Sequence, residues 1–143
     1  MTVFCTLHIR SDENARLPEG FVLSRNKTKI EFVDQAAPDV CERRMRVRRQ
    51  LGLEDVALPR YHWRLSTERF VNSDEIHQHL LWILDQIMSD IPMSESLGDK
   101  FDYWFSVFWQ GNGTGGGPMI TLKTTDLLAR HRAEMGVAFY AEP

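Results

Sequence analysis

Cysteine is scarce in this sequence: Cys5 and Cys41 are the only two, and neither belongs to a CxxC pair. Such sparse, widely separated cysteines favour reduced thiols over a disulfide framework or a zinc site. No window reaches the roughly 18 apolar residues of a membrane-spanning helix, and the first residues lack the apolar stretch of a signal peptide. These absences predict a cytoplasmic protein that does not bind a membrane.

The compact motifs of common catalytic and metal sites are also missing, among them GxSxG and HExxH. His77 and His79 would point to nearly opposite sides of a helix, so we do not expect them to share a metal, and both should face solvent. His8, His62 and His131 stand alone in the sequence. We therefore predict no catalytic residue, no metal and no cofactor.

The net charge of −3 is spread unevenly. Residues 1–60 hold 11 Lys/Arg and 9 Asp/Glu, whereas residues 61–143 hold 6 and 11, which disfavours a general polyanion binder. Five arginines lie close together: Arg43, Arg44, Arg46, Arg48 and Arg49. They either pair with acids of the same chain or form a patch for an acidic partner, with a protein favoured over a nucleic acid.

The first 58 residues show the patterns of three strands and a helix. Apolar residues alternate with other residues over Val3–Arg10, the period of a half-buried strand. Phe21–Leu23 and Lys29–Val33 have the composition of short strands. A helix is expected over Val40–Leu51, with Gly52 as its terminator.

The second half alternates strands and helices. Apolar residues recur at helical spacing from Ile76 to Ile91; Asn72 has capping-box spacing to Glu75, and Pro92 ends the run. Four strands are predicted in this half, at Tyr61–Ser66, Phe101–Gln110 (the aromatic strand), Met119–Leu122 and Val137–Ala141. A helix capped by Thr125 or Thr124 is predicted to run through Met135, with Gly136 as its terminator.

The order of these elements predicts an α+β protein. Residues 59–143 run strand, helix, strand, strand, helix, strand, which is typical of a ferredoxin-like βαββαβ core with two helices on one face of an antiparallel sheet. Residues 1–58 are expected to add edge strands and the arginine-rich helix. Because 143 residues is the usual length of one domain, we predict a single domain over residues 1–143.

A glycine-rich run follows the aromatic strand: Gly111, Asn112, Gly113, Thr114, Gly115, Gly116 and Gly117. Its letters satisfy GxGxxG, but a dinucleotide-binding loop needs a helix after the glycines, and a P-loop needs Lys followed by Ser or Thr. Here Pro118 and the predicted strand Met119–Leu122 follow. We therefore predict a hairpin loop, with a mobile loop that closes on a ligand or partner as the alternative.

The strand Phe101–Gln110 has apolar or aromatic residues on both faces, as expected of a central strand. RNA-binding βαββαβ domains stack bases on the aromatic residues of such strands. The segment Trp104–Trp109 lacks the basic and glycine positions of that signature. We therefore expect its aromatic side chains to lie in the core.

Several segments resemble a bacterial family known as domain of unknown function 4279. The resemblance lies in His62–Thr67, the glycine run, Thr125–Gly136 and Val137–Tyr140, and extends to Val3–Arg10 and Leu51–Glu54. It implies a small bacterial cytosolic protein of a kind sometimes found near toxin–immunity genes. The family has no assigned catalytic residues, so the resemblance supplies no site.

Three functions stay open. The leading hypothesis is a non-enzymatic binding protein, with an immunity protein that neutralises a toxin partner as its specific form. The first alternative is a small-ligand sensor or enzyme with a pocket between the sheet and the glycine-rich loop. The second is a nucleic-acid binder that uses Arg43–Arg49. Another protein is the expected partner, and a homodimer is left open.

Overall fold

The computed structural model describes residues 2–11, 17, 31–34, 46–47, 49–52, 61–87, 91–111 and 117–141. Its strands form one mixed sheet in the order β2-β3-β1-β4-β5. They are β1 (Thr2–Ser11), β2 (Glu31–Asp34), β3 (Tyr61–Ser66), β4 (Asp102–Gly111) and β5 (Glu134–Ala141). All neighbours are antiparallel except β4 and β5, which run parallel.

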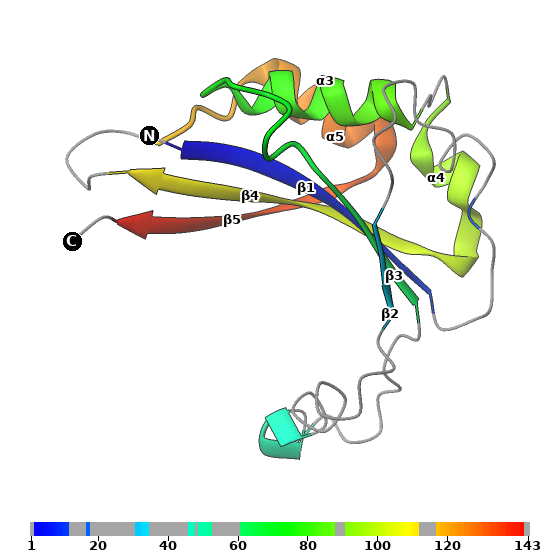
Figure 1. Ribbon diagram of the computed structural model, residues 1–143. Helices are drawn as coiled ribbons and strands as arrows, with labels where there is room; N and C mark the ends of the chain where they lie inside the picture. The colour runs from blue at the N-terminus through cyan, green and yellow to red at the C-terminus, as the bar shows by residue number, and fades with distance from the viewer. Residues whose placement is uncertain are drawn as a thin grey trace.

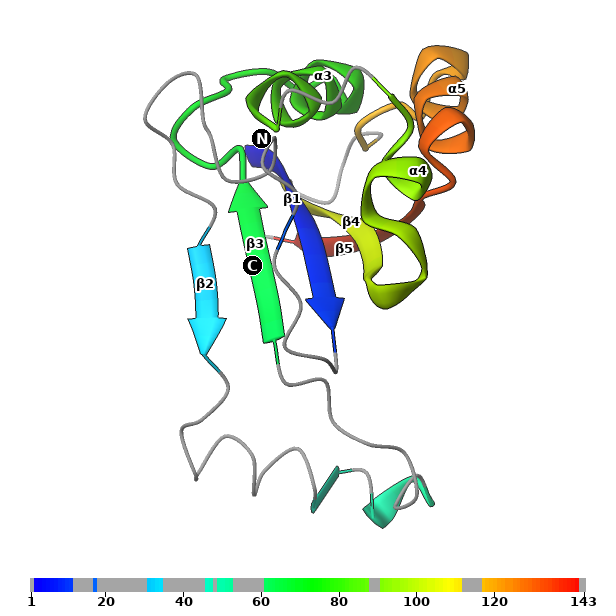
Figure 2. The ribbon, with the colours of Figure 1, turned by 90° about the vertical axis from the view of Figure 1, so that its right-hand side faces the viewer.

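The labelled helices lie on one side of this sheet (Figure 1). They are α3 (Ile76–Gln86), the short α4 (Met93–Leu97) with the 3₁₀ turn η1 (Gly98–Lys100), and α5 (Leu122–His131). The view from the side shows α3 above the strands, with α5 and α4 to its right (Figure 2). The opposite face of the sheet is covered by no helix of the described residues.

The core lies between α3 and the central strands. Successive side chains of a strand point to opposite faces, so Val3, Cys5, Leu7 and Ile9 are buried while the residues between them are partly exposed. The buried residues that pack against them include Ile76, Leu80, Ile83 and Ile87 from α3 and the turn after it, and Phe105 and Val107 from β4. The strand predicted from the alternation of Val3–Arg10 and the helix predicted from the apolar spacing after Ile76 are therefore confirmed.

The ends of α3 differ from the prediction. The helix begins after Glu75, which has no side-chain cap, and it is Ser73 Oγ that accepts a hydrogen bond from the Glu75 amide. It ends at Gln86 rather than near Ile91. Pro92 starts α4 as its N-cap instead of ending α3, which suits a residue without an amide hydrogen.

The predicted strand Met119–Leu122 and the predicted hairpin were wrong. These residues are not in a strand, and Leu122 already begins α5, whose N-cap Thr121 accepts a hydrogen bond from the Thr124 amide. Met119, Ile120 and Leu122 are exposed, so their apolar character does not signal burial in a sheet. The helix connects β4 to the parallel β5, as parallel neighbours require.

The start of β5 was also misplaced. The predicted helix was to run to Met135 and end at Gly136, but α5 stops at His131. Arg132 takes the left-handed conformation at φ 49° and closes the helix. Gly136 lies inside β5, where it pairs with Ser106.

The α+β class and the placement of the helices on one face are confirmed. The ferredoxin-like order is not, because the sheet is mixed and β1 lies in its middle, between β3 and β4, rather than at an edge. In the first half, β2 covers Glu31–Asp34 and overlaps the predicted strand Lys29–Val33, whose first two residues lie outside the described part of the chain. Residues 46–47 and 49–50 are helical, and Gly52 follows them with φ 70°, as expected of a helix terminator. The predicted strand Phe21–Leu23 lies outside the described residues.

Candidate functional site

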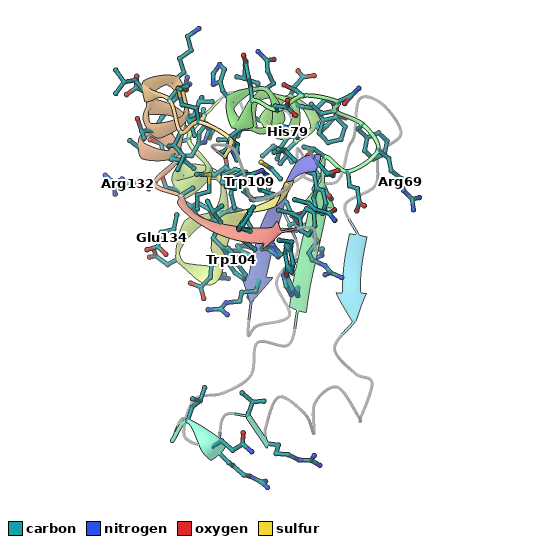
Figure 3. All side chains as sticks on the ribbon, turned by 90° about the vertical axis from the view of Figure 1, so that its left-hand side faces the viewer. Arg69, His79, Trp104, Trp109, Arg132 and Glu134 are labelled. Carbon is teal, nitrogen blue, oxygen red and sulfur yellow. The ribbon has the colours of Figure 1, made fainter. Side chains whose placement is uncertain are left out.

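The side of the sheet opposite the helices, which we name the open face, carries an unusual set of side chains. They are the residues that alternate with the buried ones: Phe4, Thr6, His8 and Arg10 on β1; His62, Arg64 and Ser66 on β3; Asp102, Trp104, Ser106 and Phe108 on β4; and Glu134, Gly136, Ala138 and Tyr140 on β5. Figure 3 shows Trp104 and Trp109 of the same strand on opposite sides of the sheet. The prediction that the aromatic residues of β4 all lie in the core was thus wrong for Trp104 and Phe108.

His8 is the centre of a hydrogen-bonded group on the open face. Its Nδ1 lies 3.1 Å from His62 Nε2, and its Nε2 lies 2.8 Å from Ser106 Oγ. The ring also stacks on Trp104, with centroids 4.9 Å apart and an interplanar angle of 4°. Three neighbours from two strands therefore hold the imidazole in one orientation.

The surroundings of His8 keep it neutral. Burial lowers its pKa from 6.5 to about 4, and electrostatic repulsion from His62 and Arg64 acts in the same direction. A neutral imidazole has one donor and one acceptor nitrogen. His8 can therefore accept from the Ser106 hydroxyl while it donates to His62, or take the reverse roles.

Aromatic rings form a second row on the open face. Phe4 and Phe108 stack with centroids 4.6 Å apart, and Tyr140 stacks on Phe108 at 4.8 Å. This row crosses β1, β4 and β5. Between it and the His8–Trp104 pair, the register places the small residues Thr6, Ser106 and Gly136 side by side.

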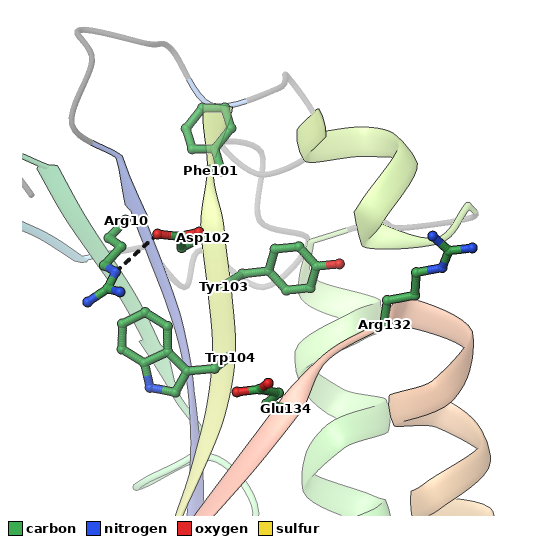
Figure 4. Close-up of a pocket in the computed structure, with 7 residues that line it drawn as sticks. All are labelled: Arg10, Phe101, Asp102, Tyr103, Trp104, Arg132 and Glu134. Atoms are coloured by element: carbon green, nitrogen blue, oxygen red, sulfur yellow. Dashed lines mark hydrogen bonds and ion pairs between the residues drawn. The ribbon is translucent and has the colours of Figure 1, made fainter. Parts of the chain in front are cut away.

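A hollow of about 450 Å³ lies at one end of the open face (Figure 4). Its lining includes four residues of the open face, Arg10, Asp102, Trp104 and Glu134. The other three lining residues, Phe101, Tyr103 and Arg132, lie outside the open face. Arg10 Nε lies 3.4 Å from Asp102 Oδ2, and the guanidinium lies 5.0 Å from the Trp104 ring centroid. Because the ion pair is exposed, we expect at most about 1 kcal/mol from it.

The end of the glycine run packs on the helix side of the sheet. A Cβ at Gly117 would overlap the Trp109 ring, which in turn contacts Phe139 with centroids 4.4 Å apart. Gly117 is therefore a site of close backbone approach rather than part of a free hairpin tip. Asn112, Gly113, Thr114, Gly115 and Gly116 lie outside the described residues.

A larger hollow of about 780 Å³ lies beside Gly117, between the start of α3 and residues 117–123. The described residues that line it come from the start of α3 with the residues before it and from residues 117–123, and none belongs to a strand. It is therefore not the predicted pocket between the sheet and the glycine-rich loop, which stays a prediction. His77 contributes to the hollow, and among the described residues its buried Nδ1 has no hydrogen-bond partner.

His79 is buried, contrary to the prediction that it faces solvent. Its Nε2 donates to the Ser73 carbonyl at 2.7 Å, and its Nδ1 lies 2.6 Å from Thr67 Oγ1. The Cys5 amide donates to the same Thr67 oxygen at 2.9 Å, so this histidine connects α3 to β1. His131 is buried as well, and its Nδ1 accepts from the Met93 amide at 3.0 Å.

The arginine-rich segment is only partly described. Arg46 and Arg49 have exposed side chains on a helical turn, and neither is paired with a carboxylate of the described residues. Arg43, Arg44 and Arg48 lie outside the described residues. Pairing of these arginines with acids of the same chain and a patch for an acidic partner both stay predictions.

The group around His8 was missed because its members are far apart in the sequence. His8, His62 and Ser106 come from three strands, and only the strand pairing brings them together. The available signal was the alternation of Val3–Arg10, which places Phe4 and His8 on the same non-core face. Several aromatic residues gathered on such a face are typical of an interaction surface.

No family model matches the chain, and no curated protein or solved structure is similar to it. The resemblance to domain of unknown function 4279 therefore stays a prediction. Within the described residues, no helix combines the length and apolar character needed to cross a membrane. The same part of the chain contains no group of three His, Cys, Asp or Glu side chains placed to hold a metal ion.

Proposed function

We propose that this chain is a non-enzymatic binding protein that holds a partner protein against the open face. The observation that carries the proposal is the gathering of Phe4, Trp104, Phe108, Tyr140 and Arg10 on the face that no described helix covers. Protein interfaces are enriched in aromatic residues and arginine, and these residues provide most of the binding energy.

The open face is also ordered before a partner arrives. The Phe4–Phe108 stack and the hydrogen bonds of His8 restrict the side chains at its centre. Binding therefore costs less side-chain entropy than it would on a surface of free rotamers. Charges of both signs at one end, from Arg10, Asp102 and Glu134, suit a partner of mixed charge rather than a polyanion.

An immunity protein is the specific form of this proposal. Such a protein neutralises its toxin by occluding it, and a broad preorganised sheet face would cover an opposing surface. This step depends on the sequence resemblance as well as on the open face, and we keep it as a proposal.

The test is a binding titration against the purified products of the adjacent genes. We expect one of them to form a complex that Trp104→Ala and Phe108→Ala each weaken by about 30-fold, the loss typical of a central anchor. Leu122→Ala is the matched control, because Leu122 is an 82% exposed apolar residue on α5, away from the open face. No complex with any neighbour, or equal weakening by the control, would contradict the proposal.

A second candidate is single-stranded nucleic acid, because Phe4, Trp104 and Phe108 stand on the two central strands, where bases stack in RNA-binding sheets. Anisotropy with a labelled oligouridine would show binding that falls steeply between about 50 and 200 mM salt. If the arginine segment takes part, Arg46→Ala and Arg49→Ala each reduce that salt dependence. No binding at low salt excludes this candidate.

A further inference from the structure

The strand β5 forms one edge of the sheet, and its composition is unusual for an edge. It pairs with β4 on one side, and no other strand of the described residues pairs with its outer side. From Met135 to Ala141 it has no charged residue and no proline. Exposed edges are ordinarily protected by lysine, proline or bulges, because unpaired amides and carbonyls recruit further strands.

The side chains of this edge are apolar and exposed on both faces. Val137 is 49% exposed and Phe139 is 47% exposed on the helix side, and Tyr140 is 54% exposed on the open face. The opposite edge differs: β2 has four residues and carries an acid at each end, Glu31 and Asp34. The segment Met135–Ala141 of β5 lacks the lysine and proline that usually protect an edge.

We propose that β5 pairs antiparallel with β5 of a second copy of the chain, about a two-fold axis at Ala138. The two five-stranded sheets would then form one continuous ten-stranded sheet. An axis perpendicular to the sheet keeps the helices of both copies on the same side. Two residues that pair across this axis must have their side chains on the same face of the sheet. An axis that passes through Ala138 meets this condition.

This register is complementary to itself, as a two-fold interface requires. Val137 lies opposite Phe139 of the second copy, an apolar cross-strand pair. Gly136 lies opposite Tyr140, and a Cβ at Gly136 would have no atom within 4 Å, so space is open for the ring. The segment of β5 that pairs within this register, Met135–Ala141, contains no charged residue, so no like charges lie opposite each other within it.

The inference does not depend on the proposed function, because it concerns the edge of the sheet rather than its open face. If both proposals hold, the open faces of the two copies form one continuous binding surface. The two proposals also fail separately: binding of a neighbouring gene product is measured by titration, and pairing of β5 by mass.

The first test is the molar mass of the protein by light scattering at roughly 100 µM, where an interface of micromolar affinity is mostly formed. We expect twice the 16.6 kDa of the chain. Val137→Lys places a charge on the edge and should return the mass of one chain, with an unchanged circular dichroism spectrum. Leu122→Lys puts the same charge on an exposed apolar residue of α5 and should leave the dimer intact.

The second test addresses the register. Ala138→Cys, in a Cys41→Ser background, should cross-link to itself on oxidation, because opposed residues of antiparallel strands have Cα atoms about 4.5–5.5 Å apart, within the range of a disulfide. Cys5 is buried and should not react. Leu122→Cys in the same background should stay uncross-linked. A wild-type mass of one chain, a dimer that survives Val137→Lys, or equal cross-linking of both cysteine variants overturns the proposal.

Discussion

The same strands place side chains on both faces of the sheet, but one face packs under helices and the other is covered by no described helix. On β4, Phe105 is 2% exposed and packs under the helices, whereas Phe108 stands on the open face and stacks between Phe4 and Tyr140. The residue type is the same and the positions are three apart. The comparison teaches that an aromatic residue in a central strand indicates burial only when a helix covers that side.

The histidines show the same division. His79 and His131 lie on the helix side and connect elements of the core by hydrogen bonds to the backbone. His8 lies on the open face and bonds to two other side chains, His62 and Ser106. Those on the helix side stabilise the fold, and we propose that His8 orders a binding surface.

The largest expected effect separates the two phenylalanines. Phe105→Ala should lower the free energy of unfolding by about 3–5 kcal/mol, because it leaves a cavity in the core. Phe108→Ala should lower it by about 1 kcal/mol, the range of a cross-strand pair. Urea unfolding of both variants measures the difference, and equal losses would show that the two faces are equally buried.

The next effect concerns pH and His8. The unfolded chain binds a proton at His8 below pH 6.5, whereas the folded chain binds it only below about pH 4. Its contribution to stability is therefore complete above pH 6.5 and is lost as the pH falls toward 4, by no more than about 3 kcal/mol because part of the ring meets solvent.

Urea unfolding across this pH range should show a shallower loss for His8→Gln than for the wild type. Some loss should remain in the variant, because burial also lowers the pKa of His131 on the helix side. Identical pH profiles for the variant and the wild type would mean that His8 is not held neutral.

The smallest effect tests the glycine run. Gly117→Ala places a methyl group against the Trp109 ring and should destabilise the protein by about 1–3 kcal/mol, as overpacking does. Gly136→Ala is the matched control, since a Cβ there has no neighbour within 4 Å. The two glycines should differ in urea unfolding at low protein concentration; equal stability would place Gly117 in a loose loop.

Features encoded within a few residues were predictable. The alternation of Val3–Arg10, the helical spacing after Ile76 and the helix terminator Gly52 depend on local geometry, and each agrees with the structure. Short apolar stretches were not predictable in the same way. Met119–Leu122 has the composition of a strand, but a segment becomes a strand only where another strand pairs with it. None of the described strands pairs with Met119–Leu122.

The amino-acid sequence by itself determined the α+β class, most of the strands and the period by which each strand divides its side chains between two faces. Only the tertiary structure decided what each face meets. It placed β1 in the middle of the sheet, buried His79, left Trp104 and Phe108 uncovered by any described helix, and brought His8, His62 and Ser106 together. The reason is that alternation is a local property of the chain, whereas the pairing of strands joins residues that are distant in sequence and carry no local mark of their partners.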